Sequence, residues 1–276
     1  MEIGSVAREV ARRTRFMSLP TTAYTPVVSK EQDEPIVSGW RLLLAIALML
    51  VLGGGVGFLT WGIMHAVSPS WTGTVDFVVL VVAEVYAAVL AALLLAFGGM
   101  GGVRRRLGLR FTSGRDLLRA IGLDLLALPV VILVYLLLSP LFGPPLTIAV
   151  PVLKSATDVT RLPHADLLAL VLIFGRVFLL VALAEELFFR GALYGWLRRH
   201  LPAWPTIFIT ALLFAFEHTA WGLPIPHIFF LLPLAFVYGI AVGWVRERTG
   251  STFNTAVMHV LVDAGLLLLA CLLILI

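Results

Sequence analysis

Long apolar runs separated by short polar connections are the feature that most restricts how this chain can fold. A helix needs about 20 apolar residues to cross roughly 30 Å of hydrocarbon, and only helices or closed barrels satisfy every backbone polar group there. The runs are continuous and Leu-rich rather than alternating, which excludes barrel strands. With 60% hydrophobic and 13% charged residues in 276 positions, the chain is too apolar for one soluble core. We therefore predict an all-α fold, a polytopic bundle of transmembrane helices.

The apolar runs divide into about seven predicted spans. They are 41–64, 75–98, 116–139, 167–197, 204–222, 226–245 and 252–275. An eighth element is left open in 140–165, where three prolines favour an irregular or re-entrant piece. Residues 1–39 are polar and lack the apolar stretch that follows the basic start of a signal peptide. We predict a cytosolic N-terminal tail over 1–39 and a transmembrane helical domain over 40–276.

Arginine residues concentrate in every second connection between these spans. The connections after the second, fourth and sixth spans contain Arg104–Arg106, Arg198 with Arg199, and Arg246 with Arg248. Those near 65–74 and 220–226 contain no Lys or Arg. Because basic loops stay on the cytosolic side, we predict a cytosolic N-terminus in a cell membrane, and the compact chain suits a prokaryote. Topology thus accounts for the net charge of +4, and we expect the lipid bilayer but no nucleic acid as a partner.

Ionisable residues inside the predicted spans are too numerous to be incidental. Such groups are costly in hydrocarbon and mark functional sites by default. Glu84 and Asp124 lie in earlier spans, and eight such residues lie in the later part of the chain: Arg176, Glu185, Glu186, Arg190, Glu217, His218, His259 and Asp263. We therefore expect a functional site within the membrane.

Two adjacent glutamates have different expected partners. Glu186 and Arg190 are four residues apart, which places them on one helix face at ion-pairing distance. Glu185 is turned from Glu186 by about 100° around the helix, so it is not a second partner for the same arginine. This leaves Glu185 as the free carboxylate and a candidate general base.

Helix geometry allows residues of three spans to meet. If 167–197 and 204–222 form an antiparallel hairpin, Glu185 and His218 lie equally far from its turn and face one another. His259 and Asp263 are one turn apart on the last span and enter from the same side. We expect these groups to converge in the cytosolic half of the membrane, in a catalytic core over 165–276.

Read in order, these residues form three motifs: E-E-x-x-x-R, F-x-x-x-H and H-x-x-x-D. Their members are Glu185, Glu186 and Arg190, then Phe214 and His218, then His259 and Asp263. Each motif alone is weak, but all three in this order on three spans resemble the CAAX-protease and bacteriocin-processing (CPBP, Abi) family of intramembrane proteases. The resemblance covers about 185–263.

The resemblance implies an endopeptidase that hydrolyses a peptide bond in a cytosol-facing cavity. In the family's terms, Glu185 and His218 activate a water, and His259 with Asp263 stabilises the oxyanion or completes the site. Glu186 and Arg190 brace it, and Phe214 forms a wall of the cavity. The implied substrate is a membrane-associated peptide or protein, either prenylated or of the leader type, and the sequence does not select between them.

The chain departs from the prenyl-endopeptidase branch at Asp263, where that branch has Asn. An Asn amide can donate a hydrogen bond to an oxyanion, whereas an ionised Asp cannot. Asp263 is therefore expected either to be protonated or to orient His259.

The involvement of a metal is left open by the sequence. Glu185, His218 and His259 are suitable types of ligand for a catalytic Zn²⁺. The H-E-x-x-H helix of zincins is absent, and a Glu–His pair can activate water without metal. We favour catalysis without a cofactor and keep Zn²⁺ as the alternative.

Two other functions fit parts of the pattern. A proton-coupled transporter would use Glu84 and Asp124 as relay groups. A non-catalytic member of the family would act as an immunity or binding protein and would not need Glu185.

Overall fold

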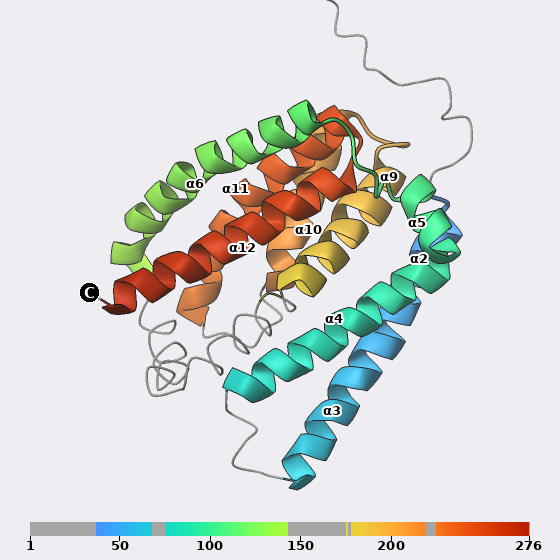
Figure 1. Cartoon of the computed structure of the whole chain (residues 1–276), viewed down its shortest axis with the longest axis horizontal. Coiled ribbons are helices and arrows are strands. Elements are labelled where there is room, and N and C mark those ends of the chain that lie inside the picture. The colour runs from blue at the N-terminus through green and yellow to red at the C-terminus, as the bar shows by residue number, and fades with distance from the viewer. Residues whose placement is uncertain (1–36, 68–74, 143–174, 176–177, 219–224, 276) are drawn as a thin grey trace, which may run out of the picture. The chain divides into compact units, whose positions relative to one another are not determined.

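The computed structural model describes residues 37–67, 75–142, 175, 178–218 and 225–275, and these residues contain helices and no strand (Figure 1). Most of the predicted tail and of the proline-rich segment 140–165 lies outside them. The elements are α2 (Gly39–Leu48), η1 (Met49–Gly53), α3 (Gly54–Val67), α4 (Val75–Phe97), α5 (Gly99–Arg106), α6 (Gly114–Phe142), η4 (Glu186–Leu193), α9 (Tyr194–Leu197), α10 (Ala203–Glu217), α11 (Ile225–Thr249) and α12 (Thr252–Leu275). Residues 178–185 are also helical and lead directly into η4. The all-α prediction is confirmed.

The first helical stretch has the length and the surface of a membrane span. Helices α2, η1 and α3 run on from Gly39 to Val67 over 29 residues, and this stretch is long and apolar enough to cross a bilayer. Its side chains Leu50 and Phe58 are 72% and 77% exposed, and lipid is a better neighbour than water for such groups. One further candidate among the described residues is the bent pair Val81–Phe97 and Gly99–Arg106. The total of seven spans stays a prediction.

A sharp bend at two glycines separates α4 from α5. Gly98 and Gly99 have φ angles of 80° and 74°, a left-handed conformation that suits glycine because it has no Cβ. The two helices meet at 83°. The sequence predicts only a connection at 99–106, whereas the structure forms a short helix there that carries Arg104, Arg105 and Arg106 in its last turn.

The helix containing the adjacent glutamates packs against two groups of helices. Leu187 and Ala192 of η4 join a buried cluster with residues of α2, α4 and α5. Phe189 joins a second cluster with residues of α6, α10, α11 and α12. In Figure 1, α4 lies along α2 and α3, and α6 lies beside α11 and α12. The position of η4 between both clusters places its polar side chains in the interior.

The backbone at Leu107, just after α5, packs closely against η4, and this contact requires a glycine in η4. A Cβ placed on Gly191 would lie 2.8 Å from the Cβ of Leu107 and 3.2 Å from its carbonyl oxygen. Leu107 is fully buried, so neither neighbour can move aside easily. The helix therefore needs a residue without a side chain at this position.

Gly191→Ala is expected to destabilise the protein by about 1–3 kcal/mol, because overpacking forces the backbone apart. Gly122→Ala in α6 is the matched control, since a Cβ there meets nothing within 4 Å and alanine favours a helix by up to about 1 kcal/mol. Thermal unfolding in detergent would compare the two variants. An equal or smaller effect at Gly191 would contradict the packing argument.

A polar cluster ties α9 and the residue after it to the end of α11, beyond the predicted span 226–245. Arg198 Nε and Nη2 donate to the two Glu247 carboxylate oxygens at 3.0 and 3.1 Å, and Tyr194 Oη donates to Oε2 at 2.5 Å. Burial alone would raise the pKa of Glu247, but the hydrogen bonds from Arg198 and Tyr194 outweigh it and hold the pKa below its ordinary value.

A carboxyl group whose pKa is lowered by folding stabilises the fold above its unfolded pKa, about 4.3 for Glu, and loses this effect as pH falls through the folded value. Glu247→Gln should therefore lower the unfolding temperature at neutral pH, and the difference from wild type should shrink below about pH 4. Unfolding scans in detergent between acid and neutral pH measure this. A difference independent of pH would exclude ionised Glu247 as its source.

Candidate functional site

The site is built on a π-helical stretch that begins at the adjacent glutamates. Element η4 runs from Glu186 to Leu193, with Glu185 as the residue before it. Such wider turns are rare and occur frequently at functional sites. Arg246 of α11 donates from Nε to the Arg190 carbonyl oxygen at 2.8 Å, so a buried side chain supports the irregular backbone. A sequence alone gives no direct signal for a π-turn.

The expected ion pair between Glu186 and Arg190 forms, and it is completely buried. Arg190 Nη1 lies 3.0 Å from Glu186 Oε1, and both side chains are 0% exposed. The guanidinium also lies over the Phe214 ring, 4.2 Å from its centroid, and donates to the Gly239 carbonyl oxygen at 3.5 Å. Phe214 therefore packs against the buried cation as well as lining the interior.

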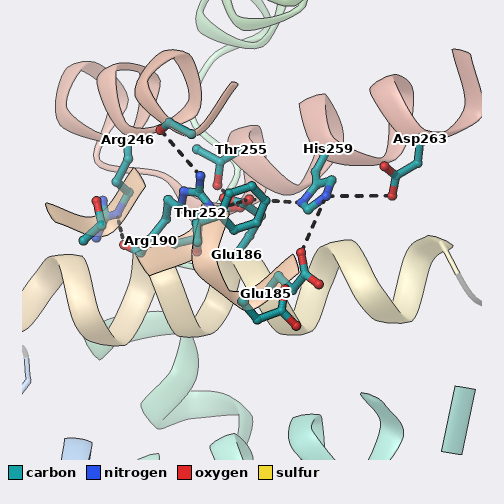
Figure 2. Close-up of polar contacts among 12 residues, drawn as sticks. Glu185, Glu186, Arg190, Arg246, Thr252, Thr255, His259 and Asp263 are labelled. Atoms are coloured by element: carbon teal, nitrogen blue, oxygen red, sulfur yellow. Dashed lines mark hydrogen bonds and ion pairs between the residues drawn. The ribbon is translucent and has the colours of Figure 1, made fainter. Parts of the chain in front are cut away.

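His259 lies at the centre of three carboxyl groups, as Figure 2 shows. Its Nδ1 is 3.1 Å from Glu186 Oε1, and its Nε2 lies 3.7 Å from Glu185 Oε2 and 3.8 Å from Asp263 Oδ2. An ionised carboxylate only accepts hydrogen bonds, so the Nδ1 contact requires an N–H there. Glu186 thus orients His259. The contacts at Nε2 are longer than a hydrogen bond.

One oxygen of Glu185 is hydrogen-bonded and the other is not. Tyr86 Oη of α4 lies 2.5 Å from Glu185 Oε1. Oε2 has no hydrogen-bond partner among the described residues, and it is the oxygen that faces His259. The Glu185 residue is only 4% exposed. A buried carboxylate oxygen without a partner is costly, which makes Oε2 the atom best suited to receive a proton.

His218 at the end of α10 approaches the same carboxyl group. One ligand atom each of Glu185, Glu217 and His218 lies within 4.8 Å of the others. His218 Nδ1 lies 2.9 Å from the Phe214 carbonyl oxygen, so this nitrogen carries the proton and leaves Nε2 free to accept. The structure thus brings Glu185, His218, His259 and Asp263 together, although their chemical roles stay predictions.

The grouping that could hold a metal differs from the one expected. Among the described residues, Glu185, Glu217 and His218 have the spacing for an ion, whereas the sequence offers Glu185, His218 and His259. His259 is outside this group, and its Nε2 lies 3.7 Å from Glu185 Oε2. The sequence marks Glu217 as an ionisable residue in a predicted span but gives it no place in the site.

Tyr86 was not singled out from the sequence, although it contacts the candidate base directly. It belongs to a predicted span outside the three motifs, and a tyrosine in an apolar helix is ordinarily a packing residue. It lines a cavity of about 270 Å³ whose other lining residues are mostly apolar: Met49, Val85, Val89, Ala184, Glu185, Phe188, Phe189 and Glu217. The candidate base therefore borders an apolar cavity.

Glu186→Gln is expected to destabilise the protein by about 3–5 kcal/mol, because it leaves the Arg190 charge buried without its partner. Thermal unfolding in detergent measures the loss. The control is the ion pair between Asp116 and Arg119 of α6, whose side chains are 36% and 70% exposed. Asp116→Asn breaks this pair and is expected to cost at most about 1 kcal/mol. Similar losses in both variants would contradict a structural role for the buried pair.

Comparison with protein families gives a match to the later part of the chain. Residues 167–265 match the family model described as type II CAAX prenyl endopeptidase Rce1-like. Comparison with curated proteins gives no match, and comparison with solved structures gives none. The matched residues contain every member of the three motifs and exclude Tyr86.

Proposed function

Since residues 167–265 match the type II CAAX prenyl endopeptidase Rce1-like family, we propose that this protein cleaves a peptide bond in a membrane-associated substrate, with Glu185 as the base that activates water. The match to this family supports a CAAX-type protease that is an integral membrane protein. The observation that carries the proposed chemistry is the unpartnered Oε2 of Glu185 facing His259 Nε2 at 3.7 Å.

The proposed reaction begins with a water held between Glu185 and His218. Glu185 Oε2 takes one proton from the water while the water oxygen attacks the carbonyl carbon of the substrate. The free Nε2 of His218 helps to hold this water. When the tetrahedral intermediate collapses, the C–N bond breaks and the proton on Glu185 passes to the leaving amine. The products are a carboxylic acid and an amine, and Glu185 is regenerated.

His259 is the proposed donor to the oxyanion. Its Nδ1–H is already given to Glu186, so a donor at Nε2 requires the imidazolium form. Glu185, Glu186 and Asp263 lie around the ring, and their negative charges favour that form. In this proposal Asp263 stabilises the positive charge on His259. Asp263 then does not have to donate a hydrogen bond to the oxyanion, as the Asn of the prenyl-endopeptidase branch can.

The substrate and the side from which it enters are also proposed. The apolar cavity beside Glu185 suits a substrate with an apolar or lipidated segment, and a prenylated C-terminal peptide is the form that the family name suggests. The basic residues of α5 and of the connection after α9 favour a cytosolic location for that end of the helices. A site opening to the cytosol would receive substrates made there.

The proposal predicts that purified protein cleaves peptides and that Glu185→Gln lowers kcat by about 10²- to 10⁴-fold, the usual contribution of a general base. Cleavage of a quenched peptide library with farnesylated and plain members, in detergent, measures this. Glu84→Gln is the control, since the proposal gives Glu84 no role while a proton-coupled transporter would depend on it. Equal loss in both variants, or full activity in Glu185→Gln, would contradict the proposal.

The same cleavage assay with a chelator distinguishes catalysis by Glu185 alone from catalysis by a bound Zn²⁺. Glutamate catalysis predicts that phenanthroline leaves the wild-type rate unchanged. Loss of activity that Zn²⁺ restores would instead support a metal held by Glu185, Glu217 and His218. Absence of cleavage with every library member, together with specific binding of a peptide, would favour the non-catalytic reading of the domain.

A further inference from the structure

We propose that Arg110 and Arg246 bind the phosphate group of an anionic phospholipid at the end of the bundle where α6 and α12 begin. This binding site goes beyond the proposed protease activity and does not depend on it. Arg110 lies in the connection between α5 and α6, outside the matched residues 167–265. Arg246 lies near the end of α11, beyond the predicted span 226–245.

The guanidinium groups of these two arginines approach one another without an acidic partner. A Cβ placed on Gly250 would lie 3.0 Å from Arg110 Nη2 and 3.7 Å from Arg246 Nη1, so both groups border the same small space. Among the described residues neither arginine forms an ion pair, and the neighbouring carboxylate of Glu247 is bound by Arg198 instead. Like charges in such proximity repel one another, and an anion held between them would offset this repulsion.

Arg246 is a buried side chain with unused hydrogen-bond donors. It is 9% exposed, and its Nε donates to the Arg190 carbonyl oxygen at 2.8 Å (Figure 2). Its two Nη atoms have no hydrogen-bond partner in the part of the chain that the structure describes. Buried donors ordinarily have acceptors, and the planar fork of an arginine matches two oxygens of a phosphate. A phosphate group would therefore supply the acceptors that Arg246 lacks.

Backbone contacts hold the two arginines in place. The Thr252 N–H donates to the Gly108 carbonyl oxygen at 2.9 Å, and Thr252 Oγ1 donates to that of Leu107 at 3.1 Å. Ser251 Oγ donates to the Arg110 carbonyl oxygen at 2.6 Å. The connection before α6 is thus fixed to the start of α12, and the two guanidinium groups meet in a preformed arrangement.

An exposed aromatic pair beside the arginines favours a lipid over a free anion. Phe111 directly follows Arg110 and is 60% exposed, and Phe253 is 36% exposed. Their rings meet edge to face with centroids 6.0 Å apart. Exposed apolar groups next to basic ones are typical of surfaces that contact anionic membranes. A phospholipid offers a phosphate to the arginines and acyl chains to the rings, whereas a free phosphate offers only the first.

Occupation of this site should also support the candidate functional site. Arg246 holds the backbone of η4 through its Nε and would hold the phosphate through its Nη atoms. A bound phosphate would thus fix the guanidinium that supports the π-helical stretch after Glu185.

The test is a titration of the purified full chain, in a neutral detergent, with dioctanoyl phosphatidylglycerol. Binding to the folded protein raises its unfolding temperature, and we expect a saturable rise. Arg110→Gln should weaken the apparent affinity about 10- to 100-fold, the usual effect of losing a hydrogen bond to a charged group. Arg110 is exposed, so this variant should fold as the wild type does. Arg105→Gln, at an exposed position of α5, removes the same charge and should weaken binding by at most about 5-fold.

Two other ligands and one further variant identify the occupant. Inorganic phosphate lacks the apolar part and dioctanoyl phosphatidylcholine has a cationic headgroup, so each should raise the unfolding temperature less than phosphatidylglycerol does. Phe111→Ala should weaken binding of phosphatidylglycerol and leave the effect of inorganic phosphate unchanged. Inorganic phosphate that binds as tightly as phosphatidylglycerol would overturn the assignment to a lipid, and phosphatidylcholine that does so would overturn the role of charge. Equal weakening in Arg110→Gln and Arg105→Gln, or no saturable rise at all, would overturn the site itself, whether or not the protein cleaves peptides.

Discussion

The buried ion pair between Glu186 and Arg190 is the interaction on which the rest of the site depends. Both side chains are 0% exposed, and removing two charges from water is costly unless their remaining polar atoms find partners. Glu186 Oε2 and Arg190 Nε have no hydrogen-bond partner among the described residues, but other contacts to the pair come from three other helices. Phe214 of α10 lies under the guanidinium, Gly239 of α11 accepts from it, and His259 of α12 donates to Glu186. Placing the pair correctly therefore places α10, α11 and α12.

Small residues allow the helices to come close enough for these contacts. A Cβ on Gly239 would lie 3.0 Å from the Cα and Cβ of Ala211, so this glycine lets α11 approach α10 at the level where its carbonyl accepts from Arg190. Gly191 does the same between η4 and Leu107. Glycine and alanine at helix contacts are typical of membrane proteins, where dispersion and polar contacts replace much of the hydrophobic driving force.

The sequence predicted those parts of the site that follow from regular helix geometry. The i,i+4 spacing gives the Glu186–Arg190 pair, and the hairpin register gives the approach of Glu185 and His218. The contact of Tyr86 with Glu185, 99 residues later, depends instead on how α4 packs against the helix that contains Glu185. The π-turn at Glu186 likewise results from tertiary contacts, such as the one from Arg246, that no local pattern encodes.

The charges of the site explain why its acidic groups need not oppose the proposed reaction. Glu186 and Arg190 neutralise one another. Beside this pair, His259 lies between Glu185 and Asp263. During attack, Glu185 becomes neutral as the oxyanion forms, so a negative charge passes from one neighbour of His259 Nε2 to another. Because the net charge would be constant and the ring of His259 is already oriented by Glu186, the proposed step requires little reorganisation. The ion pair that organises the fold thus also fixes His259, the group proposed to stabilise the transition state.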